Sequence, residues 1–126
     1  IADIEVATAR IYAGTGFEFD EVGARERSLA NQRRAWHPEG GIRQAMAALA
    51  DEDRRPGLAS LDVPTLVIHG TEDPLIPPQG GQETADAVPG AELVWIDGLG
   101  HEMPEPAWQL VLDPICALVA RVESGD

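Results

Sequence analysis

The sequence has no lysine and only one cysteine, and aromatic residues make up 5% of its 126 positions. Cys116 cannot form a disulfide within the chain, and its apolar neighbours in DPICALVA predict a small, buried core residue. This cysteine usage is compatible with a reducing, cytoplasmic compartment. Apolar runs are short and broken by charge or proline, so we expect neither a secretory signal nor a membrane span.

Basic residues are also scarce, and their distribution is uneven. Residues 1–56 contain 10 acidic and 8 basic residues, whereas residues 57–126 contain 12 acidic residues and a single basic one, Arg121. The resulting net charge of −13 repels phosphate groups, so nucleic acid and anionic membranes are not expected partners. Most of these charges are expected to form a solvated surface that keeps the protein soluble.

What the sequence does contain is enough apolar material, 44% of residues, for the core of one domain. The first half has helical spacing. One helix is expected from Asp3 until glycines end it at residues 14–16, and a second from its N-cap Asp20 to just before Pro38. A third covers residues 42–50, and the charged stretch DEDRRPG, residues 51–57, reads as a linker. Apolar residues of these helices, such as Met46, are expected chiefly in the core.

The second half has a different pattern. Leu66 to Ile68 form a continuous apolar run, which is typical of a strand covered on both faces. A helix over residues 80–88 and a second strand over residues 91–96 complete a parallel β-α-β unit. A final helix is expected over residues 107–122, with Pro114 kinking or splitting it. The predicted fold class is α/β: three helices, then a β-α-β-α unit.

A sheet of two parallel strands is too small to be stable alone, and the strand from Leu66 to Ile68 would have a neighbour on one side only. Its other edge must be covered by something. We expect either an N-terminal half absent from this sequence or a second copy in a homo-oligomer.

Two residues suited to acid–base catalysis follow the ends of the two predicted strands. Asp73 follows the first strand in TLVIHGTEDPLIPP, and His101 follows the second in GLGHEMP. Because parallel strands end at the same edge of a sheet, both side chains should lie on one side of the fold. A carboxylate that binds one imidazole nitrogen fixes the tautomer and leaves the other nitrogen to accept a proton.

Simpler interpretations remain open for each of these residues. Asp73 could be a turn residue before a proline, and His101 an ordinary loop histidine. Glu72 is a rival carboxylate that we expect to face solvent. His69 is expected to have a structural role, bonding loop backbone. A metal site of His69, Asp73 and His101 is disfavoured, since no closely spaced pair of ligands anchors it.

The motifs VPTLVIHGTEDPLIPP and PGAELVWIDGLGH, with helices between and after them, resemble the C-terminal part of an α/β-hydrolase. They are most similar to an esterase-like branch that includes aclacinomycin methylesterase. RAWHPEGGIRQAMAALA resembles that branch's cap. The resemblance implies a helical cap in residues 1–56 and a partial α/β-hydrolase core in residues 57–126.

By the same resemblance, Asp73 takes the place of the triad acid and His101 that of the base. The implied substrate is a small-molecule ester or similar acyl compound, and the implied chemistry needs no cofactor and no metal. Met103, beside the histidine, and Trp36, in the cap-like region, are the candidates for contacting substrate.

The family's nucleophile motif, G-x-S-x-G, does not occur in this sequence. Its three serines, Ser28, Ser60 and Ser124, lie in other contexts, and each is expected to be solvated. The chain also begins at Ile1, without methionine and directly in a cap-like helix, so we expect a piece of a longer protein. The nucleophile should then lie outside this chain, which alone should be inactive. The alternative is a truncated, non-catalytic module that dimerises or docks through its open sheet edge.

Overall fold

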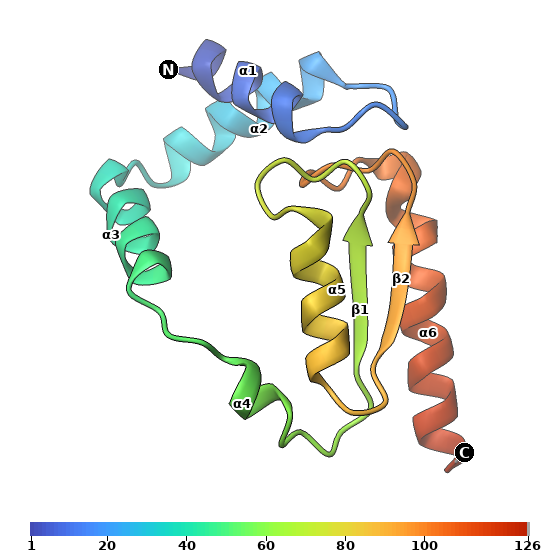
Figure 1. The fold of residues 1–126 in the computed structure, drawn as a ribbon. Helices are drawn as coiled ribbons and strands as arrows, with labels where there is room; N and C mark the ends of the chain where they lie inside the picture. Colours follow the sequence, from blue (N-terminus) through green and yellow to red (C-terminus); the bar gives the residue numbers. More distant parts are fainter. Residues whose placement is uncertain (126) are drawn as a thin grey trace.

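A computed structural model describes residues 1–125. A small parallel sheet lies between two helices, and a helical pair lies across the end toward which both strands point (Figure 1). In chain order the elements are α1 (Ala2–Tyr12), α2 (Glu21–Arg34), α3 (Pro38–Leu49), α4 (Arg55–Leu58), β1 (Leu66–Gly70), α5 (Pro78–Ala87), β2 (Glu92–Ile96), the 3₁₀ turn η1 (Glu105–Ala107) and α6 (Trp108–Ser124).

The sheet contains the expected β-α-β unit. β1 and β2 pair in parallel, with Leu66 opposite Glu92 and Gly70 opposite Ile96, and α5 forms the crossover between them. β1 runs two residues beyond the predicted strand, through His69 to Gly70. Both strands therefore deliver their following loops to one edge, which also faces α1 and α2 (Figure 1).

The core lies beneath these loops. Ile96, Leu99, Ala107 and Val111 form one buried cluster, against which partly buried Phe17 and Ile68 pack. Ile96 ends β2, Ala107 ends η1 and Val111 lies in the first turns of α6. The apolar contacts that stabilise this half thus also fix the loop after β2, because that loop runs between Ile96 and Ala107.

The outer edge of β1 and one side of α6 are uncovered in residues 1–125. β1 pairs with β2 alone, and Leu66 to Ile68 are half-buried instead of covered on both faces as predicted, since no described strand lies on the other side. α6 runs unbroken through Pro114, so the predicted split is wrong. Apolar side chains of α6 remain exposed: Leu110, Leu112, Ile115, Val119 and Val122.

In the helical half, α1 and α2 pack together and bury small side chains. Val6 and Ala24 are buried, and Asp20 caps α2 as predicted, accepting a hydrogen bond from the Gly23 N–H at 2.8 Å. Ser28, expected to be solvated, is instead buried on α2, where its hydroxyl donates to the carboxylate of Glu5.

α3 stands away from the sheet and buries none of its residues (Figure 1). Met46 and Leu49 are 61% and 82% exposed, so their expected place in the core is wrong. The predicted linker also contains the start of α4, whose Pro56 lies in the first turn, where a missing N–H costs nothing.

Cys116 is exposed on α6, which corrects the prediction of a buried thiol. The apolar neighbours that suggested burial lie largely on the uncovered surface of the same helix. Among the described residues, no helix combines the length and the apolar character that crossing a membrane requires.

Candidate active site

Asp73 and His101 meet beyond the ends of the two strands. The Asp73 Oδ2 and the His101 Nδ1 lie 2.7 Å apart, a hydrogen-bonding distance. The side chain of Asp73 is 7% exposed, whereas that of His101 is 42% exposed. The pair therefore consists of a buried carboxylate and an imidazole that remains accessible from outside.

The turn after β1 orients the carboxylate. The Asp73 Oδ1 accepts hydrogen bonds from the backbone N–H groups of Leu75 at 2.8 Å and Ile76 at 2.9 Å. This arrangement is an Asx-type turn, which aspartate favours before proline. A turn role and a pairing with His101 were alternatives in the sequence, and the structure shows both contacts, because one oxygen holds the turn and the other binds His101.

Burial raises the pKa of Asp73, but the hydrogen bond with His101 and the N–H groups of Ile76 and Leu75 together outweigh it, so the pKa lies below its usual value. The carboxyl group is therefore ionised at neutral pH. Since a carboxylate only accepts hydrogen bonds, Nδ1 of His101 carries the hydrogen, and Nε2 of the neutral ring is left with a lone pair.

His69 supports the same turn from below, in agreement with its predicted structural role. Its Nε2 donates to the carbonyl of Ile76 at 2.9 Å and lies 3.9 Å from the Asp73 Oδ2. The ring packs edge-on against Trp95, with centroids 5.7 Å apart. A Cβ at Gly81 of α5 would lie 2.7 Å from the ring, which explains a glycine there.

The backbone of His101 is held by the end of α1. The carbonyl of Tyr12 accepts the N–H groups of His101 at 2.6 Å and of Glu102 at 3.1 Å, and the carbonyl of Ala13 accepts the Gly100 N–H at 3.1 Å. Gly14 has φ of +76°, and a Cβ there would lie 2.3 Å from the carbonyl of Gly98. Glycine is thus required for this close backbone approach.

Glu72 faces solvent, as expected, and it also binds the loop after α1. It is exposed, but its Oε2 accepts the backbone N–H of Thr15 at 2.7 Å and its Oε1 accepts the Thr15 hydroxyl at 2.8 Å. Sequence reasoning missed Thr15. The only local signal was its position between Gly14 and Gly16, which predicts a sharp turn but no contact 57 residues away.

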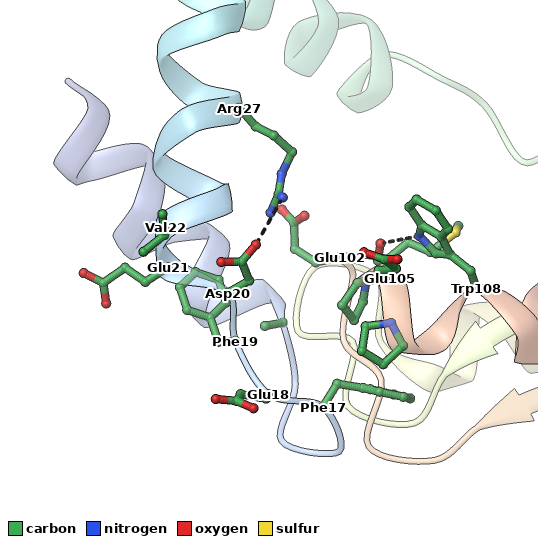
Figure 2. A pocket seen from close by; sticks show the side chains of 14 residues that line it. Phe17, Glu18, Phe19, Asp20, Glu21, Val22, Arg27, Glu102, Glu105 and Trp108 are labelled. Carbon is green, nitrogen blue, oxygen red and sulfur yellow. Dashed lines mark hydrogen bonds and ion pairs between the residues drawn. The ribbon is translucent and has the colours of Figure 1, made fainter.

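A cavity of about 970 Å³ lies between the start of α2 and the loop after His101 (Figure 2), and neither Asp73 nor His101 lines it. Met103 lines it, whereas Trp36 is half exposed and lies outside its lining. None of the serines in residues 1–125 lines it. The wall consists of Ala13, Phe17, Glu18, Phe19, Asp20, Glu21, Val22, Arg27, Glu102, Met103, Pro104, Glu105, Pro106 and Trp108.

Ion pairs neutralise some of the carboxylates around this cavity. Asp20 lies 3.8 Å from Arg27, and Glu21 lies 2.5 Å from Arg10. Glu18, Glu102 and Glu105 have no such ion pair within the described part of the chain. Within that same part, no three His, Cys, Asp or Glu side chains are grouped closely enough to hold a metal ion.

Comparison with known proteins agrees with the fold. Residues 26–106 match the family model of the alpha/beta hydrolase fold. The match covers more than half of the sequence, and the chain belongs to the α/β-hydrolase family.

Esterases are among its relatives. The chain is 32% identical over 108 residues to rhodomycin D methylesterase DauP of Streptomyces sp. (strain C5), an alignment that covers 86% of this chain and 36% of that protein. It is 38% identical over 64 residues, half of its length, to the non-heme chloroperoxidase CPO-A1 of Kitasatospora aureofaciens. The chain thus spans about a third of the length of the methylesterase, at 36%.

Solved structures give the same fold. An esterase (EaEST) from Exiguobacterium antarcticum superposes with a TM-score of 0.74 at 24% identity, covering 94% of this chain and 42% of that one. A bromoperoxidase from Bacillus anthracis also gives 0.74, at 20% identity, with 94% and 44% covered.

Proposed function

We propose that this chain supplies the acid and the base of a Ser-His-Asp esterase that acts on a carboxylic ester or similar acyl substrate. The observation that carries the proposal is the 2.7 Å bond between a buried, ionised Asp73 and the accessible His101. The methylesterase and esterase likenesses support the reaction class.

In the proposed reaction a serine from a segment outside this sequence attacks the ester carbonyl. The His101 Nε2 takes the hydroxyl proton, and Asp73 stabilises the imidazolium that forms. When the tetrahedral intermediate collapses, His101 returns the proton to the departing alkoxide. Water then attacks the acyl-enzyme, again with His101 as base, and releases the acid and the serine. No cofactor takes part.

The residues present do not complete that reaction. Ser28 is buried against Glu5, the Ser60 hydroxyl donates to the carbonyl of Gly57, and that of Ser124 donates to the carbonyl of Arg121. A base and its orienter without a nucleophile have no group to activate. We therefore propose that the 126-residue chain is inactive by itself and acts within a longer polypeptide.

The cavity next to the loop after His101 favours an apolar substrate that carries no negative charge. Phe17, Phe19, Met103 and Trp108 supply apolar wall, and the Trp108 indole donates to the Met103 carbonyl at 3.2 Å (Figure 2). The unpaired carboxylates at its rim would repel an anionic ester. Neutral or cationic esters should be hydrolysed in preference to anionic esters of the same size.

The test is ester hydrolysis by the natural polypeptide that carries this sequence, with a chromogenic acetate ester. Asp73→Asn should lower kcat roughly 10⁴-fold, because the amide favours the wrong histidine tautomer, and His101→Ala by a similar factor. Asp62→Asn, the same chemical change at an exposed site, is the matched control. Full activity in either dyad variant would refute the assignment.

A second candidate follows from the uncovered edge of β1. Its half-buried Leu66 to Ile68 and the exposed apolar side chains of α6 favour a module that pairs with another strand, either of a second copy or of a partner protein. Sedimentation of the 126-residue chain tests it. A folded monomer at micromolar concentration would argue against self-pairing, and ester hydrolysis by this chain would contradict the inactive module.

A further inference from the structure

Three segments that are distant in sequence meet around one side chain, Glu72. Its backbone N–H donates to the carbonyl of Leu99 at 2.9 Å, in the loop that leads to His101. Its carboxylate binds Thr15, in the loop after α1, through two hydrogen bonds. The next residue is Asp73, which binds His101. Glu72 therefore lies in the loop after β1 that carries Asp73 (the acid loop). It contacts the loop after α1 that carries Thr15 and the loop after β2 that carries His101 (the base loop).

The contact with Thr15 uses both carboxylate oxygens and two different donors. Oε2 accepts the backbone N–H at 2.7 Å, and Oε1 accepts the hydroxyl at 2.8 Å. Hydrogen bonds to an ionised acceptor are roughly twice as strong as neutral ones. Two of them across two oxygens also fix orientation, since neither can be kept when the carboxylate rotates.

The loop that Thr15 occupies is itself bonded to the base loop. The Gly16 N–H donates to the Gly98 carbonyl at 2.8 Å, and the Tyr12 carbonyl accepts the His101 N–H at 2.6 Å. The closed arrangement thus runs from Asp73 to Glu72, on to Thr15, through residues 12–16 to His101, and back to Asp73. Loosening any link releases a restraint on the dyad.

Thr71 closes the inner side of the same arrangement. Its hydroxyl donates to the Asp97 Oδ1 at 3.2 Å and accepts the Gly98 N–H at 2.8 Å, while its own N–H donates to the Ile96 carbonyl at 3.1 Å. The acid and base loops are thus held together next to the strand ends, without Glu72. What Glu72 adds is a direct attachment of residues 12–16 to the acid loop.

We infer that Glu72 is a positioning residue: by holding Thr15, its carboxylate fixes the loop after α1, which is bonded to the base loop, against the acid loop and so sets the Asp73–His101 geometry. Its catalytic meaning rests on the proposed esterase function, but its effect on the dyad can be measured without turnover.

The first measurement is solvent exchange of the His101 Nδ1 hydrogen, followed by NMR in the natural polypeptide. Glu72→Ala removes both bonds and should speed this exchange at least about ten-fold, as expected for losing bonds to a charged acceptor. Thr15→Val, which keeps the backbone donor, should give a smaller increase. Thr15→Ser restores the hydroxyl and should match the wild type.

Two controls separate positioning from general loss of structure. Thr84→Val removes a hydroxyl bond to the Gly80 carbonyl on α5, and Glu26→Gln changes an exposed carboxylate on α2; neither should alter the dyad. Amide exchange at Val67 and Val94 in the sheet should stay unchanged in all variants. An equal rise in the sheet and the dyad would overturn the inference, as would unchanged Nδ1 exchange in Glu72→Ala.

Ester turnover then distinguishes this inference from the proposed function. Glu72→Ala should lower kcat about ten-fold and change KM less, because the base is misplaced while Ala13 is the one cavity-lining residue within the loosened residues 12–16. If even the wild-type polypeptide hydrolyses no ester but the exchange results hold, the positioning role stands and the esterase proposal falls. If Glu72→Ala does not fold, Glu72→Gln and Thr15→Val provide the same comparison in milder form.

Discussion

The two halves of the molecule are stabilised in different ways. Residues 57–125 contain the shared core of β2, η1 and α6, built on Ile96 and Ala107, which are 3% and 0% exposed. In the helical half, α1 and α2 bury mainly small side chains, and α3 buries none. The half with the core also holds both dyad residues. The helical half contributes part of the cavity wall and the backbone groups that hold His101.

This difference suggests that the fixed geometry of the dyad and the variable wall of the cavity depend on different parts of the chain. The dyad depends on a 2.7 Å contact, and the loop that carries His101 is anchored in the buried cluster through Leu99. The cavity, by contrast, is lined partly by the start of α2, whose contacts are exposed ion pairs. Exposed ion pairs contribute little to stability, so the wall can vary without disturbing the dyad.

Truncating one isoleucine in each half gives the largest expected contrast. Ile96→Ala should destabilise the protein by about 2–5 kcal/mol, because it empties part of the core beneath the dyad loops. Ile42→Ala, on α3 at 66% exposure, should change stability by less than about 0.5 kcal/mol. Chemical denaturation of both variants measures the difference, and equal losses would show that α3 is as well packed as the core.

A smaller effect is expected at the cap of α2. Asp20→Ala removes the bond to the Gly23 N–H and should cost about 1 kcal/mol of local helix stability. Hydrogen exchange should rise in the first turns of α2 and remain unchanged in β1 and β2. A matching rise in the strands would mean that the two halves unfold together, contrary to the contrast drawn above.

The smallest effect concerns acid pH. Because the pKa of Asp73 is lowered in the folded protein, its ionised form favours folding above the unfolded pKa, and this contribution disappears as pH falls through the folded pKa. The stability difference between wild type and Asp73→Asn should therefore be constant near neutral pH and shrink below about pH 4. Denaturation at several pH values checks this, and a pH-independent difference would contradict it.

The sequence predicted the β-α-β unit well because its signals are local. The apolar run at Leu66 to Ile68, the crossover helix and the position of His101 after the second strand all follow from periodicity and strand order. The pairing of Asp73 with His101 needed only the rule that parallel strands end at one edge. The α/β-hydrolase resemblance, which the family match confirms, added the expectation of acid and base.

What the sequence did not predict depends on contacts across long separations or on neighbours that are absent. Thr15 reaches Glu72 across 57 positions, and no periodicity encodes that pairing. Cys116, Met46 and Leu49 have apolar neighbours that suggest a core, but burial requires an element on the other side, and residues 1–125 provide none for these surfaces. Ser28 is buried because it lies against α1, where its hydroxyl donates a hydrogen bond to Glu5.

The backbone bond from His101 to Tyr12, at 2.6 Å, has a mechanical consequence. The last carbonyls of α1 bind the loop that carries the imidazole. A rotation of this helix would therefore move His101 away from Asp73. Any rearrangement that admits a bulky molecule while keeping the pair together must bend the chain farther along, on either side of α3. The first helix is therefore expected to stay fixed relative to the dyad and not to move as a lid.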